Sequence, residues 1–536
     1  MKNFYFIIAS FFLVTTIHAQ NEFHVFSVNH SISPGSVSGD GSLKRPWDLQ
    51  TALNQKPKVI NGSDIIWLHE GVYKGHFVSN IKSTLKDKYI TVASFPNEWA
   101  ILNGNVQSEL NPVLTVKGSN VIYKDFEVTW LGEFSRNEND NNFIKGTGIA
   151  HLYGKNCKFI NLIIHDNPGL GFGSWNKTAG TLVEYCMVYN NGYISKGGKG
   201  IGEGMYVQNS SDTDIRQIKN NIIFNNYYKG IEVWSANKRA KDEYVKNITL
   251  ENNVIFNSGL PSNYRTVDNI IVASNDRNGI NIAKNIIVKN NILYHNTDFI
   301  KNEVKGDAAS LTIGFNKNAP VENVVVDQNI IIGGNNALRI LYAKSLSFTN
   351  NILYSGYVQV NESGLKHLDA SRWDFKNNVY FTKSKKPFRF SKTINYSFKN
   401  WASTFNVDAN SNWNYTKAFT LENVLNISKN EYKINEFRIV LFDKEGNDVY
   451  VNFSNHNLKK GMSYTIRDVE DYKKILVSGI LNDTFQVNFP MSVSNQDPYK
   501  TLNNFGVYII KFENAITTET EEEKTNFITR FFKWLF

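Results

Sequence analysis

Three short segments of this chain carry polar and aromatic side chains at matching positions. They are Gly171–Trp175, Gly204–Gln208 and Gly230–Trp234. Because side chains alternate across a β-strand, the apolar residues of each segment would point inward and the others outward. Stacked on one another, the segments then place two columns on one outer face: Trp175, Gln208 and Trp234 in the first, and Tyr206 and Glu232 in the second.

Neighbouring residues add titratable groups to this face. His151 points outward if Ala150 and Leu152 are the buried pair of the preceding segment. The other candidates are Glu203, Lys229, Lys238, Arg239, Asn275 and Arg277. Aromatic faces stack on pyranose rings, and cations bind carboxylates or sulfates. This combination predicts a groove for an acidic sugar.

β-Elimination on a uronic acid would suit these groups. The proton at C5 is weakly acidic, so the site must neutralise the carboxylate and offer a base with a pKa near neutrality. We assign Arg277, Lys238 and Arg239 to neutralisation. Proton transfer falls to three candidates, His151, Tyr206 and Lys229. A sugar leaving group makes the enzyme a polysaccharide lyase, and hydroxide at a chain end makes it an oligosaccharide dehydratase; the sequence does not separate the two.

Two other functions stay open. Hydrolysis on the same face would need two carboxylates about 5 to 10 Å apart, and Glu203 with Glu232 is a candidate pair. A non-catalytic glycan-binding or adhesin solenoid would instead show regular repeats without concentrated polar columns. Glu203 itself is a base, a cation ligand or a structural carboxylate. The two glutamates also allow a Ca²⁺ site, but no ligand spacing is diagnostic of one, and no other cofactor is predicted.

The elements that position these residues follow from a repeat. An Asn-Asn pair, replaced in one copy by Gln328-Asn329, precedes an apolar run and recurs every 22 to 38 residues, with its second Asn at Asn221, Asn253, Asn291, Asn329, Asn351 and Asn378. Each apolar run is a short strand bounded by turns, and one such coil buries its apolar face only when others stack on it. Asn tolerates left-handed turns, and its amide can bond a stacked Asn. The pattern predicts a right-handed parallel β-helix and lacks the Leu-x-x-Leu-x-Leu signature of a leucine-rich repeat.

The entry to the solenoid carries a family resemblance. Gly39-Asp40-Gly41-Ser42 and Pro46-Trp47 precede a helical cap at Leu49–Leu53, and the strands that follow start at Asp64, Gly71, Tyr89 and Ala100. This layout resembles the exported bacterial β-helix proteins related to the pectate-lyase superfamily, over roughly residues 25–390. The resemblance implies the fold and a role in polysaccharide utilisation, with an ulvan-type sulfated uronate glycan as one substrate. The turn at Gly202–Tyr206 often carries His in that superfamily where this chain has Glu203, so no His role is transferred to it.

The ends of the chain and its charge indicate an exported protein. Residues 1–19 have Lys2, an apolar run and a small Ala19, the pattern of a signal peptide, which favours a secreted or periplasmic location without a transmembrane segment. Cys157 and Cys186 fall at different positions of the repeat and are expected to be small buried residues. The net charge of +9 favours an acidic polysaccharide partner rather than nucleic acid. We expect a monomer.

The domain boundaries follow from where the repeat stops. We predict a signal peptide at 1–19, the β-helix with its N-terminal cap at 20–386, a β-sandwich at 387–515, and an acidic then amphipathic tail at 516–536. The sandwich is predicted from hairpin patterning, with strands at 437–442, 448–452, 461–469, 475–479, 485–489 and 505–511. A polar loop from Glu133 to Lys145 interrupts the coils just before the candidate face, as loops beside substrate grooves do in β-helix enzymes.

Overall fold

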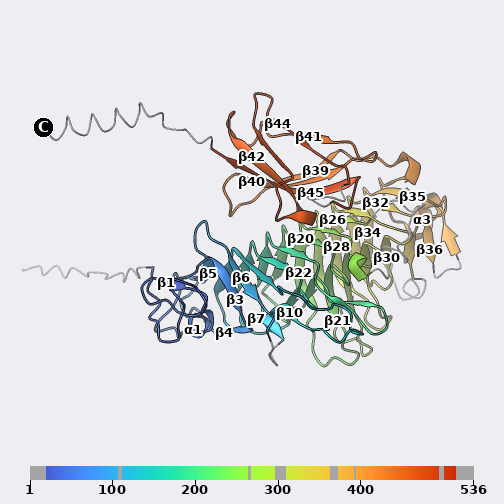
Figure 1. Cartoon of the computed structure of the whole chain (residues 1–536). Coiled ribbons are helices and arrows are strands. Elements are labelled where there is room, and N and C mark those ends of the chain that lie inside the picture. Colours follow the sequence, from blue (N-terminus) through green and yellow to red (C-terminus); the bar gives the residue numbers. More distant parts are fainter. Residues whose placement is uncertain are drawn as a thin grey trace, which may run out of the picture. The chain divides into compact units, whose positions relative to one another are not determined.

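The first unit of the protein is a right-handed parallel β-helix, as the repeat predicts (Figure 1). The computed structural model describes residues 20–106, 111–262, 267–295, 309–361, 372–390, 394–493 and 500–514. Within these residues, three 12-stranded sheets run along the solenoid, and each coil gives one strand to each sheet. The predicted signal peptide and C-terminal tail lie outside the described residues. No helix among the described residues is long and apolar enough to cross a membrane.

Sheet 1 carries the candidate site. Its strands are β4 (Phe77–Ser79), β7 (Pro112–Val116), β10 (Thr147–His151), β13 (Phe172–Ser174), β18 (Met205–Val207), β21 (Ile231–Ser235), β24 (Ile270–Ser274), β27 (Leu311–Ile313), β30 (Leu338–Ile340), β33 (Val358–Val360), β36 (Phe388–Phe390) and β37 (Ile394–Tyr396). All pair in parallel except β37, which runs antiparallel to β36.

Sheets 2 and 3 complete each coil. Sheet 2 contains β1 (Glu22–Val25), β2 (Ile65–Leu68), β5 (Ile90–Ser94), β8 (Val121–Lys124), β11 (Lys158–Ile160), β14 (Leu182–Glu184), β19 (Arg216–Lys219), β22 (Lys246–Glu251), β25 (Lys284–Lys289), β28 (Glu322–Asp327), β31 (Leu346–Thr349) and β34 (Trp373–Lys376). Sheet 3 contains β3 (Gly71–Lys74), β6 (Ala100–Asn103), β9 (Phe126–Thr129), β12 (Ile163–His165), β15 (Met187–Tyr189), β20 (Ile222–Phe224), β23 (Val254–Phe256), β26 (Ile292–Tyr294), β29 (Ile330–Ile332), β32 (Ile352–Ser355), β35 (Val379–Thr382) and β38 (Asn412–Tyr415).

The two asparagines of each repeat have different tasks at the corner between sheets 2 and 3. The first takes the left-handed conformation that turns the chain, with φ near 55° at Asn220 and Asn252. The second is buried and joins a ladder, in which the Asn221 side-chain amide donates to the Asn253 side-chain oxygen at 2.9 Å. Equivalent bonds continue through Asn291, Asn329, Asn351 and Asn378. The ladder fixes the register of successive coils.

Both ends of the β-helix are closed. The predicted cap is helix α1 (Leu49–Leu53), whose Leu49, Ala52 and Leu53 join the core. The Gln50 side chain donates to the Val78 carbonyl and accepts from the Val78 N–H, both at 2.9 Å, and so bonds the edge strand β4. At the other end, helix α3 (Phe398–Phe405) buries Trp401 against Phe388 of the last coil, with ring centroids 4.6 Å apart.

The second unit, Ala418–Phe536, has its own core and forms the predicted β-sandwich. Its larger sheet is β39 (Val424–Lys429), β40 (Glu436–Phe442), β45 (Phe505–Glu513), β42 (Ser463–Asp468) and β43 (Val477–Ile480), and its smaller sheet pairs β41 (Val449–Asn452) with β44 (Gln486–Phe489). The sequence pattern missed β39. The boundary between the two compact units lies after Lys417. The β-helix therefore extends past its predicted end at residue 386, since β36 and β38 belong to its sheets.

Candidate active site

The register of sheet 1 brings the two candidate columns together. β13, β18 and β21 pair so that Gly173, Tyr206 and Glu232 are aligned, with Phe172, Met205 and Ile231 in the core. Tyr206 and Glu232 are therefore neighbours on the outer face. Trp175, Gln208 and Trp234 follow in the adjacent column, as expected from the sequence. The rings of Trp175 and Tyr206 lie 5.2 Å apart, and Gln208 Nε2 donates to the Trp234 carbonyl at 3.0 Å.

A stack of charges lies at the corner where the chain enters sheet 1. Glu203, Lys229 and Asp268 occupy the same position in three successive coils, directly before the strands of sheet 1. Their backbones are linked by hydrogen bonds from Gly204 N to the Lys229 carbonyl at 2.9 Å and from Gly230 N to the Asp268 carbonyl at 3.2 Å. The order acid, base, acid puts Lys229 between two carboxylates.

Glycine at these corners is required by the close approach of the coils. A Cβ on Gly204 would lie 2.7 Å from the Gly230 carbonyl oxygen, and one on Gly230 would lie 2.6 Å from the Asn269 carbonyl oxygen. The two glycine positions therefore carry no side chain, and the nearest side chains are those of the neighbouring residues. This is why Glu203 and Lys229 are held at fixed places.

Ion pairs distribute the charge of this stack. The Lys229 ammonium bonds the Glu232 carboxylate, and the two residues are only 8% and 3% exposed. Asp268 pairs with Arg339 of β30 at 2.7 Å and accepts a hydrogen bond from the Thr312 hydroxyl. Burial raises the pKa of the Asp268 carboxyl, but Arg339 and Lys229 outweigh it, so the pKa lies below its ordinary value. Within the described residues, Glu203 is therefore the acidic residue of the stack that forms no ion pair with a cation.

Glu203 consequently titrates in the neutral range. Removal of water by the surrounding protein, and then the negative charge of Glu232, raise its pKa to about 7, although Lys229 and Lys199 oppose the shift. Burial and Glu232 also raise the pKa of Tyr206, whose hydroxyl therefore stays protonated. For Lys229, burial lowers the pKa, but Glu232 and Asp268 outweigh it, and the ammonium keeps its proton. Glu203 is thus the group of this cluster that exchanges a proton near neutral pH.

Aromatic rings surround the charged stack. The Lys229 ammonium lies 4.6 Å from the Tyr228 ring centroid and 5.5 Å from that of Trp234. Trp234 in turn meets the exposed Phe315 edge-on, with centroids 5.0 Å apart. Trp175, Tyr206 and Trp234 are partly exposed on this face.

The other predicted cations occupy loops at the far end of the same strands. Lys238, Arg239 and Arg277 are exposed, and Asn275 is partly exposed. The backbone N–H of Arg277 donates to the Lys238 carbonyl at 2.9 Å, so the two loops are stacked. Since β21 spans five residues at about 3.3 Å each, these loops lie roughly 16 Å from the Glu203 corner.

His151 points into the solenoid, and the prediction of an outward His151 is wrong. In β10 the alternation places Ile149 and His151 inside, and His151 is fully buried 5.2 Å from the Phe159 ring. Burial, and then the nearby Arg216 charge, lower its pKa to about 3. It therefore has no access to a substrate on the outer face.

Arg216 is a buried residue that the sequence analysis missed. Its side chain is fully buried inside the coil, where Nη1 donates to the carbonyls of Ser174 at 2.8 Å and Trp175 at 3.3 Å. Nη2 bonds Thr178. Arg216 therefore holds the turn after β13, and with it Trp175, from within the core. The one sequence feature that could have predicted this role is an Arg at a strand position that otherwise carries inward apolar residues.

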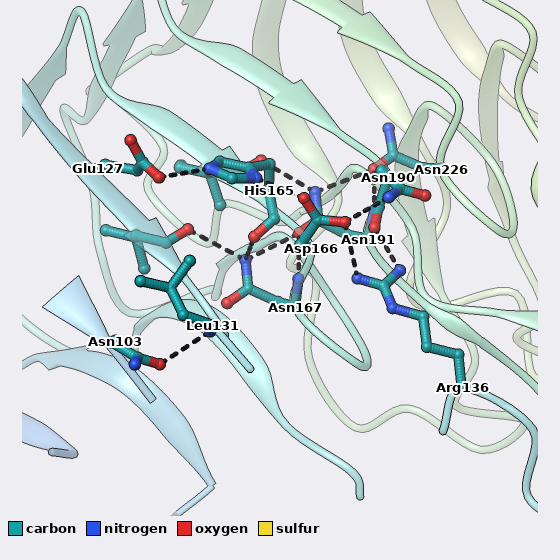
Figure 2. Close-up of polar contacts among 12 residues, drawn as sticks. Asn103, Glu127, Leu131, Arg136, His165, Asp166, Asn167, Asn190, Asn191 and Asn226 are labelled. Atoms are coloured by element: carbon teal, nitrogen blue, oxygen red, sulfur yellow. Dashed lines mark hydrogen bonds and ion pairs between the residues drawn. The ribbon is translucent and has the colours of Figure 1, made fainter. Parts of the chain in front are cut away.

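A second charged cluster lies on the outer face of sheet 3 (Figure 2). His165 contacts Glu127 through Nε2 at 2.7 Å and Asp166 through Nδ1 at 2.6 Å. Burial lowers the pKa of His165, but hydrogen bonds to the two carboxylates outweigh it, so the pKa lies above its ordinary value. Arg136, from the predicted polar loop, reaches Asp166 at 3.3 Å. No sequence pattern predicts this cluster, because its members come from separate coils and one loop.

Within the described residues, no group of three or more His, Cys, Asp or Glu side chains could hold a metal ion. The two cysteines are buried and free, as expected.

Comparison with solved structures finds other parallel β-helix proteins. Pectate lyase Pel9A is 17% identical, with 77% of this chain and 84% of that chain covered and a TM-score of 0.45. The A-module of the Azotobacter vinelandii mannuronan C-5 epimerase AlgE4 is 11% identical over 66% and 79%, with a TM-score of 0.37. The Streptococcus pneumoniae surface adhesin PfbA is 11% identical over 80% and 97%, with a TM-score of 0.46. No family model and no curated protein matches the chain.

Proposed function

We propose that this protein is an exported carbohydrate-active enzyme that cleaves or dehydrates an acidic polysaccharide or oligosaccharide by β-elimination. The observation that carries the proposal is Glu203, a carboxyl whose pKa is raised to about 7, on the same aromatic-lined face as the protonated Tyr206. A base of this strength is suited to removing a weakly acidic proton at neutral pH. The product is an unsaturated uronyl group.

In the proposed reaction Glu203 takes the C5 proton of a uronate. The electron pair of the C5–H bond forms the C4–C5 double bond, and the bond from C4 to its oxygen breaks. Tyr206, which follows Glu203 into β18, gives its proton to the departing oxygen. Lys229 does not act as the base, because its proton is held by the ion pair with Glu232. His151 is excluded by its position in the core.

The remaining side chains would bind the sugar chain. Trp175 and Trp234 offer ring faces to pyranose units, with Gln208 between them. Lys238, Arg239, Arg277 and Asn275 lie at the far end of the strands, where they would hold acidic groups of neighbouring units. A sulfated uronate such as ulvan carries such groups on successive units.

The test is to incubate the purified protein with a panel of uronate polysaccharides and oligomers and to record the absorbance of a new C4–C5 double bond. Glu203→Gln removes the base, and a loss of kcat of about 10²- to 10⁴-fold is expected. Glu251→Gln, on the outer face of sheet 2, is the matched control and should keep full activity. Unsaturated products in normal amounts from Glu203→Gln would rule out Glu203 as the base. Chain length of the product separates a lyase from a dehydratase.

Hydrolysis is the second candidate, favoured by the pairing of Glu203 with Glu232. Burial, and then the negative charge of Glu232, raise the pKa of Glu203, and a raised pKa on one of two glutamates is the usual way to obtain one acid and one base. New reducing ends without double-bond absorbance would establish hydrolysis. Binding with neither product would indicate a non-catalytic solenoid.

A further inference from the structure

A short hairpin stands beside Glu203. Strands β16 (Tyr193–Ile194) and β17 (Gly200–Ile201) pair in antiparallel fashion and lead directly into the Glu203 corner. Its turn is closed by hydrogen bonds to the Lys199 carbonyl from the Ser195 N–H at 2.9 Å and from the Ser195 hydroxyl at 2.8 Å. The backbone of Lys199 is therefore fixed, while its side chain is exposed.

The Lys199 side chain reaches the charged stack. Its ammonium lies 4.8 Å from the centroid of the Tyr228 ring, the same ring that Lys229 contacts at 4.6 Å. Lys229 is neutralised by Glu232, whereas Lys199 forms no ion pair within the described parts of the chain. The Lys199 charge also acts on Glu203, where it opposes the rise in pKa. Lys199 is thus an exposed cation at the same corner as Glu203.

The polar loop 133–145 holds this hairpin in place. The Ile194 N–H donates to the Arg136 carbonyl at 2.7 Å, and the Glu138 N–H donates to the Ile194 carbonyl at 2.8 Å. The Glu138 carboxylate also accepts from the Lys196 N–H at 2.9 Å. Arg136 is anchored in turn by Asp166 of the second cluster (Figure 2). It also donates to the Gly192 carbonyl at 3.3 Å.

We propose that Lys199 and Tyr228 form the subsite for the carboxylate of the sugar unit that reacts at Glu203. This inference rests on the proposed function and names the group that neutralises the uronate. The cations that the sequence suggested for this task, Lys238, Arg239 and Arg277, lie at the opposite end of the strands. An ammonium on the uronate carboxylate disperses the charge that develops at C5 when the proton leaves.

The test measures binding apart from turnover. Calorimetric affinity for a uronate oligosaccharide is compared in Glu203→Gln protein with and without Lys199→Gln. The second substitution should weaken binding about tenfold or more. The carboxyl-reduced oligosaccharide should bind both proteins equally. Lys196→Gln, in the same turn, is the matched control and should leave both affinities unchanged.

In active protein, Lys199→Gln should also move the acidic limb of the pH profile to higher pH, because a positive charge near Glu203 is lost.

Each outcome has a distinct meaning. Equal uronate affinity with and without Lys199, or an equal loss for the carboxyl-reduced ligand, overturns the subsite. If binding depends on Lys199 but the wild-type protein forms no unsaturated product, the proposed elimination reaction is wrong and the subsite stands. If Lys199→Gln forms unsaturated product with normal kinetics, the elimination reaction stands and the subsite is wrong. Absence of all uronate binding overturns the subsite whatever product forms.

Discussion

A single carboxyl group shows how burial sets the chemistry of this face. Glu203 keeps its proton near neutrality because the protein removes water from it and Glu232 adds a negative charge, whereas Asp268 in the same column is ionised by Arg339. Two carboxyls at equivalent positions thus differ in proton affinity because the charges around them differ. The acid that lacks such a partner is the one suited to proton transfer.

This imbalance should appear in the stability of the protein. The folded state holds a proton on Glu203 up to about pH 7, while the unfolded chain releases it near the ordinary value of 4.5. Stability contributed by Glu203 is therefore fully present below pH 4.5 and is lost as pH rises through about 7. The loss is up to ~3 kcal/mol.

Glu203→Gln should be less sensitive to this change of pH, because the amide does not titrate. Denaturant unfolding of the wild type and the variant across this pH range measures the difference. Glu251→Gln, as control, should follow the wild type. Parallel curves for wild type and Glu203→Gln would contradict the assigned pKa.

Strand alternation explains both the success and the error of the sequence-based site. It gave the columns of β13, β18 and β21 correctly because each has large apolar residues that fix which side is inside. At β10 the pattern predicts Ala150 and Leu152 as the buried pair, because this segment has few large apolar residues that fix which side is inside. The structure buries Ile149 and His151 instead. Since the strand period is two, that choice moved His151 to the wrong face.

Contacts between distant segments could not be read from the repeat. Arg339 and Asp268 lie two coils and 71 residues apart in sequence, and Arg136 meets Asp166 only because a loop folds back over sheet 3. The position of Asp268 was predictable from the local sequence, because Asp268-Asn269-Ile270 aligns with Lys229-Gly230-Ile231 of the preceding coil. The fold itself was predictable, because the repeated pair marks the corner between sheets 2 and 3 in six successive coils.

The loop 133–145 and the hairpin should act as one element. Arg136→Gln removes the side chain that ties the loop to Asp166 and Gly192, so the amides of Ile194 and Glu138 should exchange hydrogen faster. The hairpin would then hold Lys199 less firmly, and kcat/KM should fall roughly fivefold. Hydrogen exchange and steady-state kinetics measure these effects. Arg45→Gln, at an exposed ion pair, is the control. Unchanged exchange at both amides would show that Arg136 does not hold the hairpin.

At the scale of the whole chain, the charge of +9 should favour the capture of a polyanion. Raising the salt concentration from about 50 to about 200 mM shortens the screening length and should raise KM several-fold for a uronate polymer, with kcat unchanged. Steady-state kinetics at several ionic strengths test this. Affinity for a carboxyl-reduced polymer should not respond to salt. A salt-independent KM for the charged polymer would mean that the overall charge plays no part in binding.

The closed ends of sheet 1 have a consequence for how these molecules behave when crowded together. The last strand of an open solenoid has unpaired backbone N–H and C=O groups, so the first strand of another copy can pair with it and continue the sheet. Here the Gln50 amide already occupies the hydrogen-bonding groups of Val78 at one edge, and β37 reverses the strand direction at the other. Growth of a fibre by addition of parallel strands to this sheet is thereby blocked at both edges.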